Sequence, residues 1–590
     1  MIFGKNINRY YLKYLPSLLL GLLALLVVDY MQLQVPRLYG MVINGVNNGF
    51  VELDGLSVPF DMAFLLDRIC NPMLFIILTM IIGRFLWRVC LFGAGIKVET
   101  DIRRRLFSHA KDLSQEFYQV NKVGELMSLF TNDLETVQDC FGSGILMMVD
   151  AVALGAMSLG KMGAMDLKLT LLSLIPMVAM LAAALIVGKY MTVKWEKRQE
   201  AFSRLSDFSQ ESFSGIAVIK AFVKEAKELS CFRKLNKENE QINVAYTRLS
   251  AGLNAAITLF IGSVICIILG YGGYLVYRGV FNAGQLLEFI SYFTTIIWPV
   301  MAVSELIEMH SKGKASMGRI DEFLAARQDV ADRPAVTDPG SLSGKIQLKH
   351  LTFRYPGTDR DVLKDISFTI EPGEQVGLIG RTGAGKTTLV DLLLRIYNVP
   401  DGTVFLDDTD VNDMPIAAVR RSAAYVPQDN VLFSESIEKN VAFAVDGASH
   451  EQVTQAAALA DVHDNIVSFP HGYETLLGER GVTISGGQKQ RVSIARALMK
   501  DAAILILDDS VSAVDTATEK VILDNLRTTR RGKTTILIAH RISTVENMDK
   551  ILFLDEGRLL DMGTHEELLS RCKAYANMVA LQKLEEKKED

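Results

Sequence analysis

The chain has 590 residues, enough for two or more domains, and a formal net charge of −6 at pH 7, so no basic surface favours nucleic acid as a partner. Apolar residues make up 49% of it and the mean hydropathy is +0.22, which is high for a soluble protein. The six cysteines are scattered without a close pair and the eight histidines lack ligand spacing, so neither a disulfide framework nor a zinc site is expected.

The first half of the chain contains six apolar stretches, each near the ~20 residues that cross a bilayer. They cover approximately residues 15–38, 72–95, 141–165, 169–190, 252–277 and 283–303. Basic residues precede the first stretch (Lys5, Arg9 and Lys13) and follow the second and fourth, whereas the 46–71 loop is acidic on balance. The positive-inside rule therefore predicts six spans, with the N- and C-termini in the cytoplasm.

Polar side chains interrupt three of these stretches. Two alternatives account for them, because a charge at this depth needs either a partner or a water-filled cavity. One is a structural ion pair between spans two and three, and the other is a role in a substrate cavity. The residues are Asp29, Gln32, Arg84, Arg88 and Asp150.

The segments 96–140 and 191–251 are charged and keep helical patterning, which predicts that the spans continue as helices into the cytosol. A helix after the sixth span ends near Arg327, so the transmembrane domain is expected over residues 1–327. Prolines and glycines mark 328–344 as a linker. From Lys345 strands alternate with helices, which predicts an α/β nucleotide-binding domain over 345–585, before a charged tail at 586–590.

A glycine-rich loop lies between an apolar strand and a helix in this second domain. Its glycines allow backbone N–H groups to surround a phosphate at the start of a helix, where the dipole favours an anion. Lys386 is positioned to reach the β- and γ-phosphates of ATP, and the Thr387 hydroxyl to bind Mg²⁺. The loop reads Gly380-Arg381-Thr382-Gly383-Ala384-Gly385-Lys386-Thr387-Thr388. Further on, an apolar strand ends at Asp508, a second expected contact of Mg²⁺.

Together with Ile484-Ser485-Gly486-Gly487-Gln488, these features resemble an ABC exporter half-transporter over nearly the whole chain. The resemblance implies a six-helix transmembrane domain with a P-loop ATPase domain of ABC type, and cytosolic loops whose short coupling helices contact the ATPase domains. It also implies an adenine-stacking role for Tyr355, a Mg²⁺ and water contact for Gln428, and a γ-phosphate contact for His540. Ser485, Gly486, Gly487 and Gln488 would close over ATP held by the other subunit, and Asp515 would cross the interface. The chain has one glycine-rich P-loop, residues 380–388, and one signature, residues 484–488. Because a complete ATP site would need the P-loop of one subunit and the signature of the other, the chain is expected to work as a dimer.

One position departs from the family pattern. Asp509 stands where active members carry the Glu that positions the attacking water, and its carboxylate is about 1.3 Å shorter in reach. Since a misplacement of ~1 Å can cost about 100-fold in rate, ATP is expected to bind but to be hydrolysed slowly at this P-loop. The intact signature can still complete a partner's site. This pattern resembles the degenerate subunit of bacterial heterodimeric multidrug exporters.

The resemblance implies a half-transporter in the bacterial cytoplasmic membrane, surrounded by lipid, with a second ABC half-transporter as partner. The substrate would be a hydrophobic or amphipathic small molecule or peptide. Two alternatives stay open: a homodimeric lipid or peptide exporter that hydrolyses ATP slowly at two Asp-containing sites, and an ATP-gated regulatory subunit without turnover.

Overall fold

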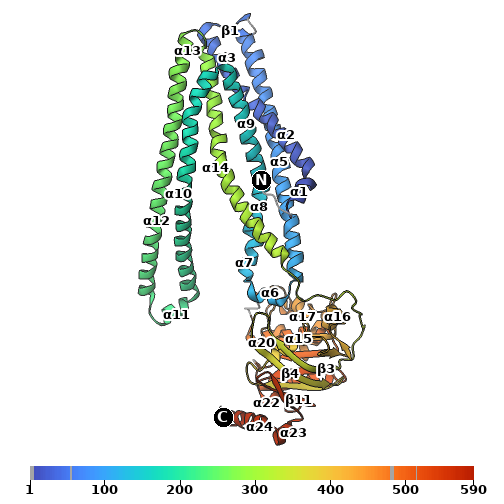
Figure 1. The fold of residues 1–590 in the computed structure, drawn as a ribbon. Coiled ribbons are helices and arrows are strands. Elements are labelled where there is room, and N and C mark those ends of the chain that lie inside the picture. The colour runs from blue at the N-terminus through green and yellow to red at the C-terminus, as the bar shows by residue number, and fades with distance from the viewer. Residues whose placement is uncertain (1–5, 54–55, 479–483, 513, 590) are drawn as a thin grey trace. The chain divides into compact units, whose positions relative to one another are not determined.

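The computed structural model describes residues 6–53, 56–478, 484–512 and 514–589, so Lys5 and the last residue of the predicted tail lie outside it (Figure 1). The chain divides into two compact units. One consists of Met1–Ala110 and Gly124–Ala325, and the other of Lys111–Val123 and Ala326–Asp590. The boundary after Ala325 lies two residues before the predicted end of the transmembrane domain. A short piece of the first cytosolic loop belongs to the second unit.

The first unit is helical. Among the described residues, six helical stretches are long and apolar enough to cross a membrane, which confirms the predicted number of spans: Leu15–Asn48, Met62–Asp112, Val123–Met165, Leu167–Ser214, Glu225–Tyr277 and Ala283–Ala325. The α-helices of this unit are α1 (Asn8–Lys13), α2 (Leu15–Gln32), α3 (Val35–Asn48), α4 (Met62–Phe64), α5 (Asn71–Asp112), α7 (Val123–Ser128), α8 (Leu134–Phe141), α9 (Ser143–Met165), α10 (Leu167–Ser214), α11 (Ile216–Ala221), α12 (Glu225–Ile267), α13 (Gly273–Tyr277) and α14 (Ala283–Ala325).

Several of these stretches contain local irregularities with identifiable causes. Pro36 lies in the first turn of α3, where the missing N–H of proline would have no intrahelical acceptor, whereas Pro176 and Pro299 lie inside α10 and α14. Single π-helical turns occur at Leu65–Cys70, Leu129–Asp133 and Ile268–Gly272, and a hairpin of β1 (Phe50–Leu53) and β2 (Leu56–Pro59) connects the first two spans.

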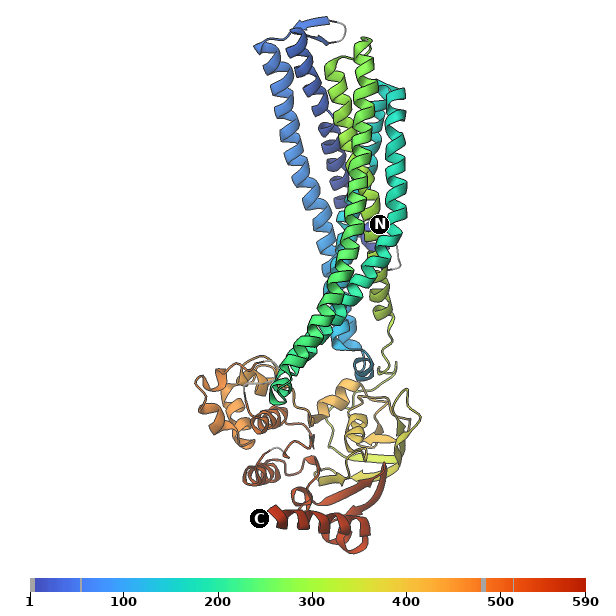
Figure 2. The same ribbon diagram turned by 90° about the vertical axis from the view of Figure 1, so that its left-hand side faces the viewer.

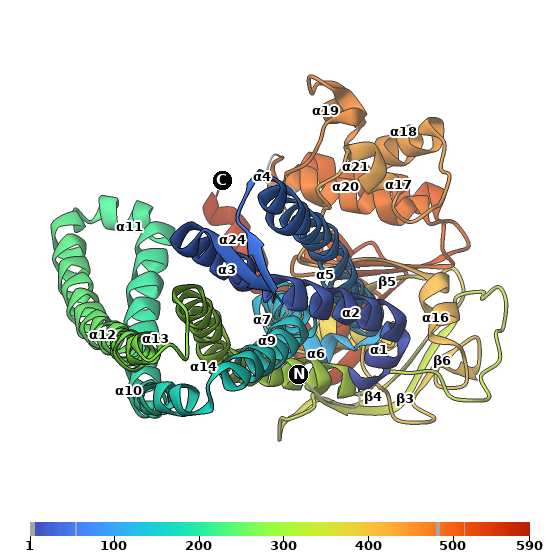
Figure 3. The ribbon, with the colours of Figure 1, turned by 90° about the horizontal axis from the view of Figure 1, so that it is seen from above.

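The predicted continuation of the spans as long helices is present. Helix α5 continues to Asp112, α10 to Ser214, and α12 begins at Glu225, far from the apolar parts of these helices. Helices α10 and α12 pack along one another, with the short α11 at the tip of their hairpin (Figure 2). Helix α9 packs against α14 and α2, and the view from above shows α10 and α12 as a pair next to α14 (Figure 3).

The second unit is built on two sheets. A six-stranded sheet has the order β12-β11-β5-β10-β9-β8, with β11 to β8 parallel and β12 antiparallel at the edge. An antiparallel sheet has the order β4-β3-β6-β7. The strands are β3 (Ile346–Arg354), β4 (Asp361–Ile370), β5 (Gln375–Gly380), β6 (Val404–Leu406), β7 (Thr409–Asp410), β8 (Ala423–Val426), β9 (Ile504–Asp508), β10 (Thr534–Ala539), β11 (Lys550–Asp555) and β12 (Arg558–Gly563).

Helices cover the faces of the parallel sheet, whose strands β9 and β10 are buried along their whole length, as is typical of parallel strands. The helices are α6 (Gln115–Val120), α15 (Lys386–Leu393), α16 (Ile416–Ser422), α17 (Ile437–Ala442), α18 (His450–Leu459), α19 (His463–Val467), α20 (Gly486–Met499), α21 (Thr516–Thr529), α22 (Ile542–Val545), α23 (His565–Arg571) and α24 (Lys573–Glu589). The sequence-based fold class, helical membrane domain plus α/β ATPase domain, is confirmed. Neither helix nor strand occurs between Ala325 and Ile346, where the linker is predicted.

Candidate nucleotide site and membrane cavity

The register of the parallel sheet brings the predicted ATP-binding residues to one edge. Strand β10 pairs Ile538 with Asp508 of β9 and Ala539 with Ile379 of β5. The glycine-rich loop follows β5, Asp508 ends β9 and His540 follows β10, so three segments distant in sequence meet at the carboxyl ends of adjacent strands. This edge is where open α/β sheets bind their ligands.

The glycine-rich loop has little room for side chains. A Cβ on Gly380 would lie 2.0 Å from the carbonyl oxygen of Leu554, and Gly383 and Gly385 adopt φ values of +81° and +94°. Lys386 is only 7% exposed, and its ammonium donates to the carbonyl oxygens of Gly380 (2.9 Å) and Arg381 (3.2 Å). Burial lowers the pKa of Lys386, while Asp508 and Asp509 oppose that shift. The loop thus holds a cation beside backbone N–H groups at the start of α15.

Asp508 provides a direct test of the expected Mg²⁺ site. The side chain is 2% exposed, and its Oδ2 has no hydrogen-bond partner among the described residues. Burial raises the pKa of Asp508, and the hydroxyl of Thr387, which donates to the carboxylate, opposes that shift. A buried carboxylate oxygen without a donor is costly, and a hydroxyl next to it completes an all-oxygen donor set. The residues present therefore fit a divalent cation.

Asp509 has an unusual backbone. Its φ is +50°, the left-handed region that Asp tolerates better than most residues, and its N–H donates to the carbonyl of Ile538 at 3.0 Å. Asp509 and His540 both act electrostatically on Asp508, so the three side chains lie in one neighbourhood. Gln428, two residues past β8, is exposed. These positions agree with the predicted catalytic roles, which stay predictions.

Tyr355 lies beside the loop with its hydroxyl 2.8 Å from the hydroxyl of Thr388. Its ring packs edge-on against Tyr397 at 5.2 Å between centroids, and it remains partly exposed. Stacking on adenine stays a prediction. Tyr397 in turn interacts with Gln119 and Glu116 of α6. The coupling helix expected in the first cytosolic loop is thus linked to the nucleotide site through two tyrosines, a connection that the spacing of the residues did not reveal.

The signature residues Ser485, Gly486, Gly487 and Gln488 begin a helix. Ser485 is the N-cap of α20: its Oγ accepts from the N–H of Gln488 (3.2 Å), and the Gln488 side chain accepts from the N–H of Ser485 (3.0 Å). Ser485 and Gly486 are exposed, so the serine hydroxyl hydrogen stays available to a ligand from outside. Asp515 caps α21 by accepting from the N–H of Thr518 at 3.0 Å. Its predicted position at an interface stays a prediction.

Sequence analysis missed two side chains behind the site. Asp391 of α15 and Tyr425 of β8 both interact with Asp508. Burial, with a smaller contribution from Asp508, raises the pKa of Asp391 to about 6. The one available signal was a carboxylate on the apolar helix after the P-loop, where a charged group is costly unless it serves a site.

The membrane charges do not form the expected ion pair. Asp150 accepts from the indole N–H of Trp298 at 2.8 Å, and Arg84 donates to the side chain of Gln32 at 3.5 Å. Among the described residues, Asp150 has no ion pair with Arg84 or Arg88 within 4 Å. Of the two alternatives, the ion pair between spans two and three is therefore not formed: α9 packs against α14 and α2, and Asp150 contacts Trp298 of α14. All five predicted polar residues instead line one cavity of about 430 Å³.

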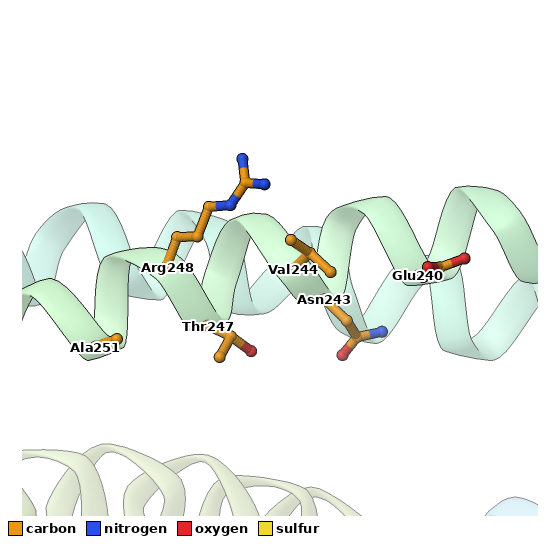
Figure 4. Close-up of a pocket in the computed structure, with 6 residues that line it drawn as sticks. All are labelled: Glu240, Asn243, Val244, Thr247, Arg248 and Ala251. Carbon is orange, nitrogen blue, oxygen red and sulfur yellow. The ribbon is translucent and has the colours of Figure 1, made fainter.

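A second hollow lies on α12 between Glu240 and Ala251 and measures about 330 Å³. Figure 4 shows that the labelled side chains, among them Glu240, Asn243 and Arg248, come from this one helix. A single helix face does not surround a ligand, so this hollow is not a candidate site.

The fold and the nucleotide site define a membrane-embedded ATPase with one ATP-binding domain per chain. Residues 18–300 match the ABC transporter transmembrane region and residues 363–512 match the ABC transporter family of ATPase domains. The chain belongs to the ABC transporter family, and it has the architecture of an exporter, a multi-pass protein of the bacterial membrane.

Individual relatives agree over almost the entire length. The chain is 36% identical to the "Probable multidrug resistance ABC transporter ATP-binding/permease protein YheI" of Bacillus subtilis strain 168, covering 98% of this chain and 97% of the relative. It is 34% identical to the "Multidrug resistance-like ATP-binding protein MdlA" of Escherichia coli K12, covering 96% and 94%. A solved bacterial Atm1-family ABC exporter with ATP bound is similar over 98% of both chains, with 26% identity and a TM-score of 0.75.

Proposed function

We propose that this chain is one half of a heterodimeric exporter that uses ATP to move amphipathic or hydrophobic compounds out of the cell, with both termini in the cytoplasm. The observation that carries the proposal is Asp509, which stands beside an otherwise complete set of nucleotide-binding residues. The names of the relatives, which describe multidrug resistance proteins, support the substrate class.

Within this proposal the P-loop residues and Tyr355 bind ATP, and Thr387, Gln428 and Asp508 would hold Mg²⁺, which would supply charge neutralisation at the phosphates. Asp509 and His540 are the catalytic side chains of a slow site. Ser485, Gly486, Gly487 and Gln488 complete the partner's faster site, with Asp515 at the interface.

A partner subunit is also supported by apolar side chains at the tip of the α10–α12 hairpin. Phe213, Phe222 and Val223 are 74%, 70% and 79% exposed. An apolar surface next to the cytosolic end of two charged helices is typical of a protein–protein contact rather than of a solvated loop. In a dimer this tip can be covered by the partner's ATPase domain.

The test uses the complex purified through a tag on this chain. We expect a second ABC half-transporter, with Glu at the position that corresponds to Asp509, to copurify. Asp509→Asn, which removes charge and keeps shape, should lower total ATPase activity less than twofold. Asp509→Glu should raise hydrolysis at this P-loop, by less than the ~100-fold that restored reach alone allows, because Glu fits a φ of +50° less well than Asp.

Two results would contradict the proposal. A near-complete loss of ATPase activity in Asp509→Asn would show that this chain carries the main catalytic carboxylate. Purification of the chain as a homodimer with full transport activity would show that no second type of subunit is needed.

A further inference from the structure

The polar cavity in the membrane unit is built from four helices and is large enough for a ligand. Asp29 and Gln32 come from α2, Arg84 and Arg88 from α5, Asp150 from α9 and Trp298 from α14. Its volume of about 430 Å³ falls within the range of about 300–1,000 Å³ that is usual for small-molecule sites.

Asp29 is a buried residue of this cavity whose side chain is only partly satisfied by the described residues. The side chain is 2% exposed, and its Oδ2 has no hydrogen-bond partner among the described residues. Asp150 repels Asp29 by its charge and also shares a side-chain hydrogen bond with it, for which one of the two carboxyl groups must carry a proton, while the guanidinium of Arg84 attracts Asp29. Two neighbouring buried carboxyl groups are strongly unfavourable when both are charged, so the pair requires a shared proton or a cation.

The two arginines of the cavity, both on α5, are without an ion pair. Within the described residues, neither Arg84 nor Arg88 forms an ion pair within 4 Å, although two carboxylates line the same cavity. Arg84 donates to the neutral amide of Gln32 and attracts Asp29 without contact, and the guanidinium of Arg88 lies 5.4 Å from the ring centre of Trp87. The carboxylates, on α2 and α9, and the arginines, on α5, therefore stay separate charged groups of one cavity.

From this separation we infer that the cavity binds a zwitterionic amphiphile, with its ammonium group at Asp29 and Asp150 and its anionic group at Arg84 and Arg88. The inference rests on the proposed export function, since it names the chemical class of the exported compound. Trp298 holds Asp150 through its indole N–H and is 44% exposed, so its ring face is available to the substituents of an ammonium group.

A matched set of three fluorescent probes tests the charge pattern. Nε-dansyl-lysine carries an ammonium and a carboxylate, dansylcadaverine only the ammonium, and 6-(dansylamino)hexanoic acid only the carboxylate, on the same aromatic body. Binding is measured by fluorescence on the complete transporter in nanodiscs, without nucleotide. The wild-type protein should bind the zwitterion about tenfold more tightly than either singly charged probe, since charge-assisted hydrogen bonds at each end contribute on that scale.

The variants should produce a crossed pattern. Asp29→Asn and Asp150→Asn should reduce affinity for the zwitterion and for dansylcadaverine by about tenfold and leave the carboxylate probe unaffected. Arg88→Gln should reduce affinity for the zwitterion and for the carboxylate probe by about tenfold and leave dansylcadaverine unaffected. Lys161→Gln removes a charge from α9 outside the cavity lining and should leave all three affinities unchanged.

Other outcomes overturn the inference. Equal affinity for the three probes, or equal effects of all variants on all probes, would show that the charges do not select a ligand. Loss of thermal stability in Asp29→Asn or Arg88→Gln without any change in probe affinity would show that the charges pair within the assembled dimer. Because binding is measured without nucleotide, neither result depends on the Asp509 experiment.

Discussion

The buried carboxylate of Asp508 leads to a prediction about the nucleotide-free protein. Asp508→Asn keeps the size and the acceptor of the side chain but removes a charge that is 2% exposed and has one oxygen without a partner among the described residues. An unsatisfied buried polar group costs about 1–3 kcal/mol, so the variant should stabilise the ATPase domain by about 1 kcal/mol when nucleotide is absent. Lys386 keeps its two carbonyl acceptors in the variant.

The same change should weaken the response to Mg-ATP. At a ligand concentration of 100 Kd, binding stabilises the wild-type domain by about 2.7 kcal/mol, and a tenfold weaker Kd reduces this to about 1.4 kcal/mol. The variant should thus be more stable than the wild type without ligand and less responsive to it. The physical reason is that the Asp508 carboxylate lowers the stability of the nucleotide-free domain and gains a cationic partner when Mg-ATP binds.

The assay must report on the second unit. All three tryptophans, Trp87, Trp195 and Trp298, lie in the first unit, so tryptophan fluorescence follows the wrong part of the chain. Hydrogen–deuterium exchange of the β9 peptide does report on this domain, and 1 kcal/mol corresponds to an exchange rate about fivefold slower. Asp524→Asn, an exposed substitution on α21, is the control and should change exchange very little. Faster exchange in nucleotide-free Asp508→Asn, with an unchanged response to Mg-ATP, would refute the reasoning.

Two further predictions concern other parts of the same domain. Gly487→Asp places a negative charge where the signature should meet the partner's γ-phosphate, so the complex should lose most of its ATPase activity while ATP binding at this chain's own P-loop persists; retained activity would contradict a role in trans. Because burial raises the pKa of Asp391 to about 6, above its ordinary 3.8, the native domain binds this proton more tightly than the unfolded chain does. Stability should therefore fall as pH rises from about 4 to about 6, and Asp391→Asn should flatten that profile; identical pH profiles in exchange experiments would refute this.

The sequence alone determined the architecture and predicted the residues of the nucleotide site. Six apolar stretches of bilayer length are unambiguous because apolar burial in lipid requires a long uninterrupted run. The motifs of the nucleotide site are local patterns, because each consists of residues adjacent in sequence. They are the glycine-rich loop, the strand that ends at Asp508 and the signature at the start of a helix. Asp509 was visible for the same reason, because one position in a motif departs from its family.

Only the tertiary structure decided which distant side chains meet. An arginine partner for Asp150 was one of two alternatives in the sequence, but the packing of α9 against α14 gave it Trp298 instead. The burial of Asp391 beside Asp508 and the route from α6 through Tyr397 to Tyr355 likewise depend on how elements far apart in sequence pack. Sequence periodicity specifies which face of a helix is apolar, but the neighbour on that face is chosen by the packing of the whole bundle.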